Sequence, residues 1–334
     1  MPFLNATPLR HALSASLLSL SLLAPILTTQ VKAAPVSAQE FQNLLKEERA
    51  WAGLSSKSLR VGDVSWVYSE GGSTDKPTVL LIHGLAGSRD NWNRVARYLT
   101  PYYHVIIPDL PASGDTKAPS TFDLSVPNIT EQLRRFAEAA KITENLHVAG
   151  HSLGGAIAML YTAQYPLDTK SLFLIDTAGV FKAGNTPYLK DPTQLKQMIV
   201  SKTGDFDLVL KKVMQNPPFL PQGYKEAQEK VMIAQAPETN RIVEQIITLN
   251  KAYTPDSFAL LARSIDIPTL ILWGKEDKIM NVEVAAELKS ILKNAQAPVI
   301  LNNVGHIPIL EAEQLVIQQY LPFLSKVQSP ATTH

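Results

Sequence analysis

Short apolar runs recur along this chain, and most of them are followed by loop-forming residues and then by a helical pattern. They occupy residues 78–82, 105–107, 146–149, 172–175, 269–273 and 299–301. Runs this short and this apolar predict strands that are buried on both faces of a sheet. Because these strands alternate with helices, the chain is predicted to form an α/β fold whose central sheet is mostly parallel and flanked by helices.

The alternation breaks between residues 182 and 263, where no strand-like run occurs. Two helical stripes of apolar residues lie in this segment: Phe206, Val209, Leu210 and Val213, followed by Ile242, Val243, Ile246 and Ile247. Between the stripes, the proline-rich residues 216–221 cannot continue a helix. We therefore expect a helical cap at 182–263, inserted before the penultimate strand, with 60–181 and 264–326 forming the α/β core.

The first 33 residues differ in composition from the rest of the chain. Arg10 precedes an apolar run over residues 12–27, and small residues surround a cleavage-like site at Ala33. A basic start, a moderately long apolar run and a small-residue site are typical of an export signal. We therefore predict a signal peptide at residues 1–33 and an exported protein, either periplasmic or secreted.

Two alternatives stay open at this end of the chain. Cleavage after Ala38 fits the small-residue pattern as well as cleavage after Ala33. A retained membrane anchor is less favoured, because the apolar run is short for a span and is broken by Pro25. The stretch that follows, near residues 34–60, looks mobile.

Charge and cysteine content exclude several classes of protein. Lysine and arginine number 31 against 30 acidic residues, without a run of like charge, so a nucleic-acid partner is not expected. The chain has no cysteine, which excludes disulfides, thiolate metal sites and a lipid-modified N-terminal cysteine. We expect no cofactor and no metal ion, and nothing indicates an obligate protein partner.

A serine flanked by glycines follows the third apolar run. Gly150, His151, Ser152, Leu153 and Gly154 lie after a predicted strand and before a helix-forming segment. This is the context in which Gly-x-Ser-x-Gly forms a strained turn that exposes its serine as a nucleophile. Ser152 is therefore the candidate nucleophile, and it needs a base to accept its proton and donors to stabilise an oxyanion.

The base is expected to be a histidine in a loop at the strand ends. Six of the seven histidines lie in the signal, at the end of the chain, in strands, next to the serine or in an earlier loop, and these are His11, His334, His104, His147, His151 and His83. His306 remains, in a loop after the last apolar run. It is the candidate base, so activity should rise as its imidazole loses a proton near neutral pH.

An acid has to orient the imidazole and support the charge that it acquires. Asp277 follows the penultimate apolar run and is the preferred candidate. Glu276, one residue away, and Asp176, at the end of an earlier run, remain as alternatives. For the oxyanion, we expect the backbone N–H of Leu153 and, from the glycine-containing loop after residue 82, the backbone N–H of Leu85.

With these motifs in place, the sequence resembles the α/β-hydrolase superfamily, and within it the exported bacterial lipases and esterases similar to monoacylglycerol lipases. The resemblance covers nearly all of residues 60–325. The segments that carry it are 83–88, 90–92, 108–111, 150–155, Trp273-Gly274 with Asp277, and Gly305-His306 with Pro308. It implies that Ser152 is acylated, that His306 is the base and Asp277 its partner, and that the insertion covers an acyl pocket.

One segment departs from the pattern of these relatives. They usually continue Asp-Leu-Pro with glycine, an aromatic residue, glycine, any residue and serine, whereas this chain has Ala-Ser-Gly-Asp-Thr at residues 112–116. The departure leaves Ser152, Asp277 and His306 untouched. It weakens any substrate preference borrowed from the relatives.

The leading functional hypothesis is carboxylic ester hydrolysis through an acyl-enzyme, on a lipid-like or medium-chain acyl ester, and it is compatible with contact at a lipid interface. Six aromatic residues of the cap region are candidates to line the acyl pocket: Phe181, Tyr188, Phe206, Phe219, Tyr224 and Tyr253. Dehalogenases and epoxide hydrolases of this fold place Asp where Ser152 stands. The alternatives are a carbon–carbon bond hydrolase and a hydrolase-fold binding protein with slow turnover.

Overall fold

The computed structural model describes residues 36–328, and of residues 249–252 it describes only the backbone. Its eight strands form one sheet in the spatial order β1-β2-β4-β3-β5-β6-β7-β8. The strands are β1 (Leu54–Val61), β2 (Val64–Gly71), β3 (Thr78–Ile82), β4 (His104–Pro108), β5 (Leu146–His151), β6 (Thr169–Ile175), β7 (Thr269–Gly274) and β8 (Val299–Leu301). The β1–β2 and β2–β4 pairs are antiparallel, whereas all pairs from β4 to β8 are parallel. The predicted fold class is confirmed.

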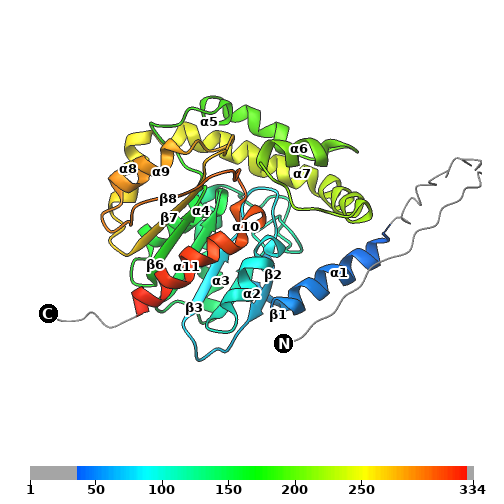
Figure 1. The fold of residues 1–334 in the computed structure, drawn as a ribbon, viewed down its shortest axis with the longest axis horizontal. Coiled ribbons are helices and arrows are strands. Elements are labelled where there is room, and N and C mark those ends of the chain that lie inside the picture. Colours follow the sequence, from blue (N-terminus) through cyan, green and yellow to red (C-terminus); the bar gives the residue numbers. More distant parts are fainter. Residues whose placement is uncertain (1–35, 329–334) are drawn as a thin grey trace, which may run out of the picture. The chain divides into compact units, whose positions relative to one another are not determined.

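Helices cover both faces of this sheet and one end of it (Figure 1). The flanking helices are α1 (Ala38–Trp51), η1 (Arg89–Trp92), α2 (Asn93–Leu99), α3 (Val126–Ala139), α4 (Leu153–Gln164), α9 (Glu283–Ile291), α10 (Pro308–Glu311) and α11 (Glu313–Gln328). Between β6 and β7 lie α5 (Pro187–Lys190), η2 (Pro192–Met198), α6 (Asp205–Val213), α7 (Gln222–Ala252) and α8 (Pro255–Arg263). Figure 1 shows α5 to α8 gathered above the sheet, as expected for a cap inserted before the penultimate strand.

The alternation of side chains along each strand produces two cores. In β3, for example, Leu80 and Ile82 pack on the face covered by α3 and α4, whereas Val79 and Leu81 pack on the face covered by α2 and α11. All four side chains are fully buried. A strand buried on both faces is apolar at every position, which is why these strands were visible as continuous apolar runs.

The expectation of a mobile stretch near residues 34–60 is wrong over the residues that the structure describes. Residues 38–51 form α1, whose N-terminus is closed by a capping box between Ser37 and Glu40. Its buried face, with Phe41, Leu45 and Arg49, repeats every four residues. Strand β1 follows at once, so the ordered fold begins before the expected boundary at residue 60.

The predicted signal peptide at residues 1–33 lies outside the described residues. Within residues 36–328, none of the helices combines the length and the apolar character that crossing a membrane needs.

Candidate active site

The connection between β5 and α4 is a sharp turn with Ser152 at its apex. Ser152 has φ 53° and ψ −120°, in the half of backbone space that favours glycine. The two glycines around it are required by packing: a Cβ on Gly150 would lie 2.2 Å from the carbonyl oxygen of Gly154, and a Cβ on Gly154 would lie 2.2 Å from that of Ile82. The turn therefore holds the serine side chain at the end of the strand.

A chain of hydrogen bonds begins at this serine. The Ser152 hydroxyl donates to Nε2 of His306 at 2.9 Å, and Nδ1–H of His306 donates to Oδ2 of Asp277 at 2.7 Å. The other carboxylate oxygen of Asp277 accepts from the amides of Ile279 at 2.8 Å and Met280 at 3.0 Å. These bonds use both carboxylate oxygens of Asp277 and the Nδ1 of His306, so we assign these two residues no role in holding a metal ion.

The three side chains come from distant segments that end at the same edge of the sheet. Ser152 follows β5, Asp277 follows β7 and His306 follows β8. The cap takes part in placing the histidine, because the His306 amide donates to the carbonyl oxygen of Val213 in α6 at 2.7 Å. The structure thus brings together the three residues that the sequence singled out.

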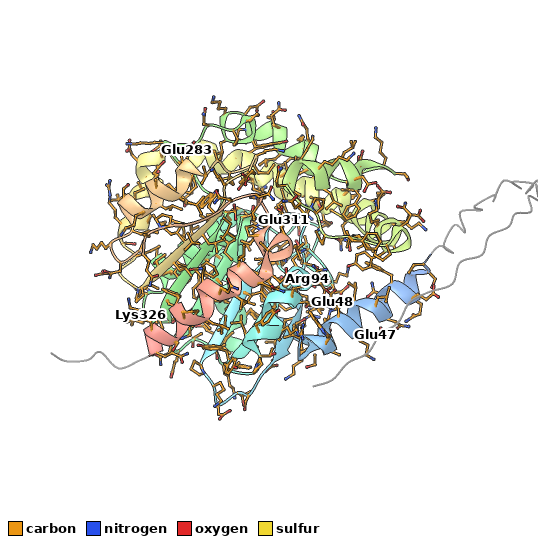
Figure 2. All side chains as sticks on the ribbon, in the orientation of Figure 1. Glu47, Glu48, Arg94, Glu283, Glu311 and Lys326 are labelled. Atoms are coloured by element: carbon orange, nitrogen blue, oxygen red, sulfur yellow. The ribbon has the colours of Figure 1, made fainter. Side chains whose placement is uncertain are left out.

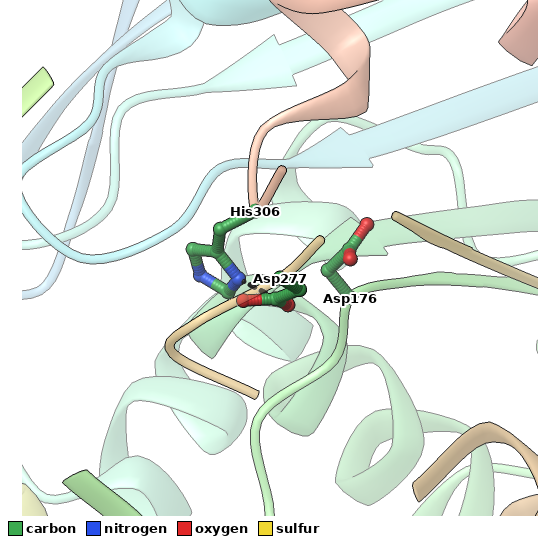
Figure 3. A group of neighbouring side chains, drawn as sticks. All are labelled: Asp176, Asp277 and His306. Atoms are coloured by element: carbon green, nitrogen blue, oxygen red, sulfur yellow. Dashed lines mark hydrogen bonds and ion pairs between the residues drawn. The ribbon is translucent and has the colours of Figure 1, made fainter. Parts of the chain in front are cut away.

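Among the described residues, neither of the two alternative acids forms a hydrogen bond with His306. Glu276 points to the backbone instead and accepts from the amide of Val304 at 2.9 Å. Asp176, at the end of β6, is fully buried and accepts from the Gly274 amide at 2.9 Å. Figure 3 shows Asp277 lying between His306 and Asp176. Burial, followed by the charge of Asp277, raises the pKa of Asp176 well above its usual range.

His151 is the histidine closest in sequence to the serine, and its surroundings exclude it as a base. Its Nε2–H donates to the carbonyl oxygen of His306 at 2.6 Å. Burial, followed by the proximity of His306, lowers the pKa of His151 to about 3. The imidazole is therefore neutral at ordinary pH, and its hydrogen bond supports the backbone of the His306 loop.

His83 has both ring nitrogens occupied by backbone groups. Its Nδ1–H donates to the carbonyl oxygen of Gly84 at 2.8 Å, and its Nε2 accepts from the amide of Leu110 at 3.0 Å. Burial lowers its pKa. His83 therefore joins the loop after β3 to the loop after β4 and has no nitrogen left for a substrate.

The expected oxyanion donors belong to two segments close to Ser152. Leu153 is the first residue of α4, and Leu85 lies in the loop after β3. That loop is close to the serine, since a Cβ on Gly84 would lie 3.1 Å from the Cβ of Ser152. Among the described residues, no protein group accepts a hydrogen bond from the amide of Leu85 or of Leu153. Both amides are thus free for a ligand.

An ion-pair cluster, buried at Arg89 and Asp109 but exposed at Asp115, lies at the end of the same loop. The Arg89 amide donates to Oδ1 of Asp109 at 2.6 Å, and its guanidinium pairs with Asp109 and, at 2.7 Å, with Oδ2 of Asp115. Asp115 belongs to the segment 112–116 that departs from the relatives' pattern. The cluster therefore ties this unusual segment to the loop that carries Leu85.

A cavity of about 280 Å³ opens over Ser152 and His306. Its apolar lining comes mainly from the cap and the neighbouring loops: Leu195, Met198, Phe206, Val209, Leu210, Val213, Met214, Ile279, Ile307 and Leu310. A concave, mostly apolar surface around a few polar groups is typical of a small-molecule site. The hydrogen-bonded chain therefore faces a pocket suited to a ligand with an apolar part, and charged residues such as Glu48, Arg89 and Arg94 also line it.

One wall of this pocket was not predicted from the sequence. Helix α1 contributes Phe41, Leu45 and Glu48, and Phe41 packs edge-on against Tyr224 of α7 with ring centroids 5.1 Å apart. Glu48 lies beside Arg94 of α2 (Figure 2). Burial, followed by the charge of Asp90, raises the pKa of Glu48. The four-residue spacing in α1 and its capping box could have identified this helix.

The six aromatic residues proposed for the pocket divide into different environments. Only Phe206 and Tyr224 line it. Phe181 is buried against Phe258 of α8, with ring centroids 5.4 Å apart. Phe219 is 89% exposed. The expectation was therefore wrong for most of the six, because an aromatic residue in a cap packs equally well into the core.

Comparisons with known proteins agree with this geometry. The family model described as alpha/beta hydrolase fold matches residues 77–313. Lipase 1 of Psychrobacter immobilis is 35% identical over 291 residues, which are 86% of this chain and 90% of that protein. The crystal structure of Lip1 from Acinetobacter baumannii AYE is 69% identical, covers 86% of this chain and 96% of its own, and has a TM-score of 0.85. The crystal structure of a membrane phospholipase A is 36% identical in sequence. It covers 88% of this chain and 93% of its own, with a TM-score of 0.82.

Proposed function

The chain belongs to the alpha/beta hydrolase fold family, and from this premise we propose that it hydrolyses carboxylic esters of lipid-like acids through an acyl-enzyme on Ser152. In this proposal His306 is the general base, Asp277 orients it, and the amides of Leu85 and Leu153 stabilise the oxyanion. The observation that carries it is the unbroken chain of hydrogen bonds from Asp277 to Ser152, which ends in an apolar cavity.

The first half-reaction forms the acyl-enzyme. The Ser152 oxygen attacks the ester carbonyl carbon while its proton passes to Nε2 of His306, which already accepts the hydroxyl hydrogen bond. Negative charge develops on the carbonyl oxygen, where the two free amides can donate to it. The C–O bond to the alcohol then breaks, and the alcohol leaves with the proton from His306.

The second half-reaction reverses these roles. A water molecule gives its proton to Nε2 of His306 and attacks the acyl carbon. The Ser152–acyl bond breaks, the proton returns to the serine oxygen, and the acid is released. Asp277 stays ionised throughout and balances the imidazolium that forms in each half.

The lining of the cavity by the cap supports a position for the acyl chain of the substrate. Phe206, Leu210 and Val213 of α6 line the cavity. The carbonyl oxygen of Val213 also accepts a hydrogen bond from the amide of His306. The acyl chain would therefore bury its methylene groups against α6 while its carbonyl stays at the serine. Relatives named Lipase 1 and membrane phospholipase A make a lipid ester the substrate class to test first.

The exposed Phe219 supports contact with a lipid surface. It stands between Pro218 and Leu220, which both line the pocket. The loop is anchored because Glu311 accepts from the amides of Gln215 at 2.8 Å and Asn216 at 2.9 Å. Phe219→Ser should lower hydrolysis of emulsified triglyceride several-fold and leave turnover of a soluble ester unchanged, because only the emulsion requires surface contact. Equal effects on both would contradict this role.

Export is also part of the proposal. The basic residue and apolar run of residues 1–33 support a cleaved signal. Cleavage after Ala33 would preserve Ser37, whose hydroxyl caps α1, whereas cleavage after Ala38 would remove it. We expect the N-terminal sequence of protein recovered outside the cytoplasm to begin at Ala34. A full-length chain in the cytoplasm would contradict export.

The central test labels the nucleophile and follows turnover in the same samples. A fluorophosphonate should label one residue per chain, on the peptide containing Ser152, and Ser152→Ala should lose both labelling and ester turnover. Ser290→Ala, on an exposed helix position, is the matched control and should keep both. Unchanged turnover in Ser152→Ala would overturn the mechanism.

The substrate arm of this test addresses the alternative functions. Aryl esters of increasing acyl length are compared with a vinylogous diketone, the substrate type of a carbon–carbon bond hydrolase. We expect turnover of the esters, with a preference set by the apolar cavity. Exclusive turnover of the diketone would favour the carbon–carbon bond hydrolase, and labelling without turnover of either would favour a binding protein.

A further inference from the structure

Two buried carboxyl groups lie side by side behind the proposed base. Asp176 follows β6 and Asp277 follows β7, and the Asp277 carboxylate and the whole of Asp176 are shielded from solvent. One carboxylate oxygen of Asp176, one of Asp277 and one ring nitrogen of His306 all lie within 4.8 Å of one another. Among the described residues, no lysine or arginine forms an ion pair with either aspartate. Two ionised carboxylates in this place would repel each other without a fixed cation to balance them.

The hydrogen bonds around the pair favour a proton on Asp176 over one on Asp277. Asp277 accepts three hydrogen bonds, from His306 and from two backbone amides. Asp176 accepts one at Oδ1, from Gly274, while its Oδ2 is buried without a donor among the described residues. An ionised oxygen left there would lack a partner, whereas a protonated one can donate to Asp277, which lies within hydrogen-bonding reach.

We propose that Asp176 is a neutral carboxylic acid whose hydroxyl donates to Asp277 and holds the Asp277 carboxylate against the imidazole of His306. Asp176 is thus a positioning residue, and this inference rests on the ester hydrolysis proposed above. The raised pKa of Asp176 agrees with it: burial is the main cause, and the charges of Asp277 and Glu311 add to it. The titratable groups that face Asp176 are Asp277, Glu311 and His306.

The backbone holds Asp176 in this place. Its φ of 42° is in the left-handed region, which is uncommon for a residue with a side chain. Its amide donates to the carbonyl oxygen of Leu272 at 3.1 Å, and its carboxyl accepts from Gly274, so both groups are tied to β7. Strand β7, which leads into Asp277, therefore fixes the position of Asp176 relative to Asp277.

The charge state has a direct consequence for catalysis. With Asp176 neutral, the pair carries one negative charge, which the imidazolium balances when His306 takes the serine proton. With Asp176 ionised, a second buried negative charge would favour the protonated imidazole and move the loss of activity in acid to higher pH. The acid limb of the pH profile therefore distinguishes the two states.

The experiment compares two substitutions at residue 176 with a matched control. Asp176→Asn keeps a donor toward Asp277 and an acceptor for Gly274, as a neutral acid does, whereas Asp176→Ala removes both. Asp168→Asn makes the same change at a buried acid that precedes β6 and pairs with Arg134. It controls for the removal of a buried carboxyl from a residue that flanks the same strand, β6.

We expect Asp176→Ala to lower kcat about tenfold with little change in KM, because the oriented acid is lost. Asp176→Asn should recover most of this loss and keep the midpoint of the acid limb of kcat/KM within a few tenths of a pH unit. Asp168→Asn should leave kcat and the acid limb unchanged. By NMR, the Nδ1–H resonance of His306 should be preserved in Asp176→Asn and should shift or broaden in Asp176→Ala.

Two results would overturn the inference. A fall of about one pH unit in the acid limb of Asp176→Asn would show that Asp176 is ionised in the working enzyme. Unchanged kcat and an unchanged resonance in folded Asp176→Ala would show that it positions nothing. The resonance can be measured without turnover, so failure of the ester hydrolysis proposal would be distinguishable from failure of this inference.

Discussion

Two buried groups of histidine and aspartate lie at the same edge of the sheet, and they differ in what their histidines face. At the ends of β3 and β4, both nitrogens of His83 are bonded to the backbone, and Asp109 is paired with Arg89. Beyond β7 and β8, Asp277 is bonded to His306, whose second nitrogen faces a serine. The same residue types therefore serve two purposes.

The difference lies in where the balancing positive charge comes from. Arg89 is a permanent cation, so the charge of Asp109 is balanced without any proton transfer, and the pair joins the segments that follow β3 and β4. Asp277 has no such partner, and its charge is balanced only when His306 takes a proton. A buried aspartate without a fixed cation favours that proton transfer, which a catalytic base requires.

The largest effect that separates the two groups is expected at His306. His306→Ala should lower kcat/KM for an aryl ester by about 10⁴-fold or more, because among the described residues His306 is the base hydrogen-bonded to the Ser152 hydroxyl. Circular dichroism should show the fold intact. Loss of less than tenfold in a folded variant would mean that another base serves Ser152.

A somewhat smaller effect is expected at the acid. Asp277→Asn keeps the shape of the side chain but favours the wrong tautomer of His306, and kcat should fall about 10³-fold. Steady-state kinetics from pH 5 to pH 9 measure this loss. If Asp277→Asn kept full activity while Asp176→Asn lost it, the assignment of the two acids would be reversed.

At the group that contains His83, Asp109 and Arg89, the expected effect is on the stability of the fold. Arg89→Met leaves Asp109 buried without its cation, and it should lower the free energy of unfolding by about 3–5 kcal/mol. Burial already raises the pKa of Asp109 despite Arg89. Urea unfolding measures the loss, and Lys293→Met, at an exposed ion pair, is the control. A stable but inactive Arg89→Met would assign Arg89 to the chemistry instead.

The last effect, which is the smallest when taken per pH unit, concerns the stability of Asp176→Asn and its dependence on pH. The pKa of Asp176 is raised in the folded protein, so the stability it contributes is complete below the ordinary value of 3.8 and is lost as pH rises toward the folded-state value. Asparagine does not titrate. The free energy of unfolding of Asp176→Asn relative to the unchanged protein should therefore increase with pH, by up to about 1.4 kcal/mol per pH unit. A difference that is constant from pH 5 to pH 8 would contradict a neutral Asp176.

The burial of each element determined whether it could be predicted from the sequence. Strands β3 to β7 are buried on both faces, so their apolar runs were visible in the sequence. Strand β1, by contrast, is largely exposed, and β2 alternates buried and exposed residues over part of its length. Helix α1 is mostly polar and buries a narrow stripe. These elements were missed because their stability depends on contacts that appear only after folding.

In the site, the catalytic candidates could be identified from their positions along the chain, whereas the charge state of the buried acids could not be predicted. Ser152, Asp277 and His306 could be selected because each follows a predicted strand in a recognisable order. The sequence could not show that Asp176 shares a buried place with Asp277, since the two are brought together by the pairing of β6 with β7. It also could not show that α1 lines the pocket, because that contact depends on α7.

If Ser152 carries the acyl group during turnover, the acyl-enzyme can be trapped and detected. The enzyme is mixed with a short-chain aryl ester, quenched in acid within the first turnover and analysed by mass spectrometry of its peptides. We expect the mass of one acyl group on Ser152, with little or none in His306→Ala. Burst release of the phenol without an acyl group on Ser152 would contradict it.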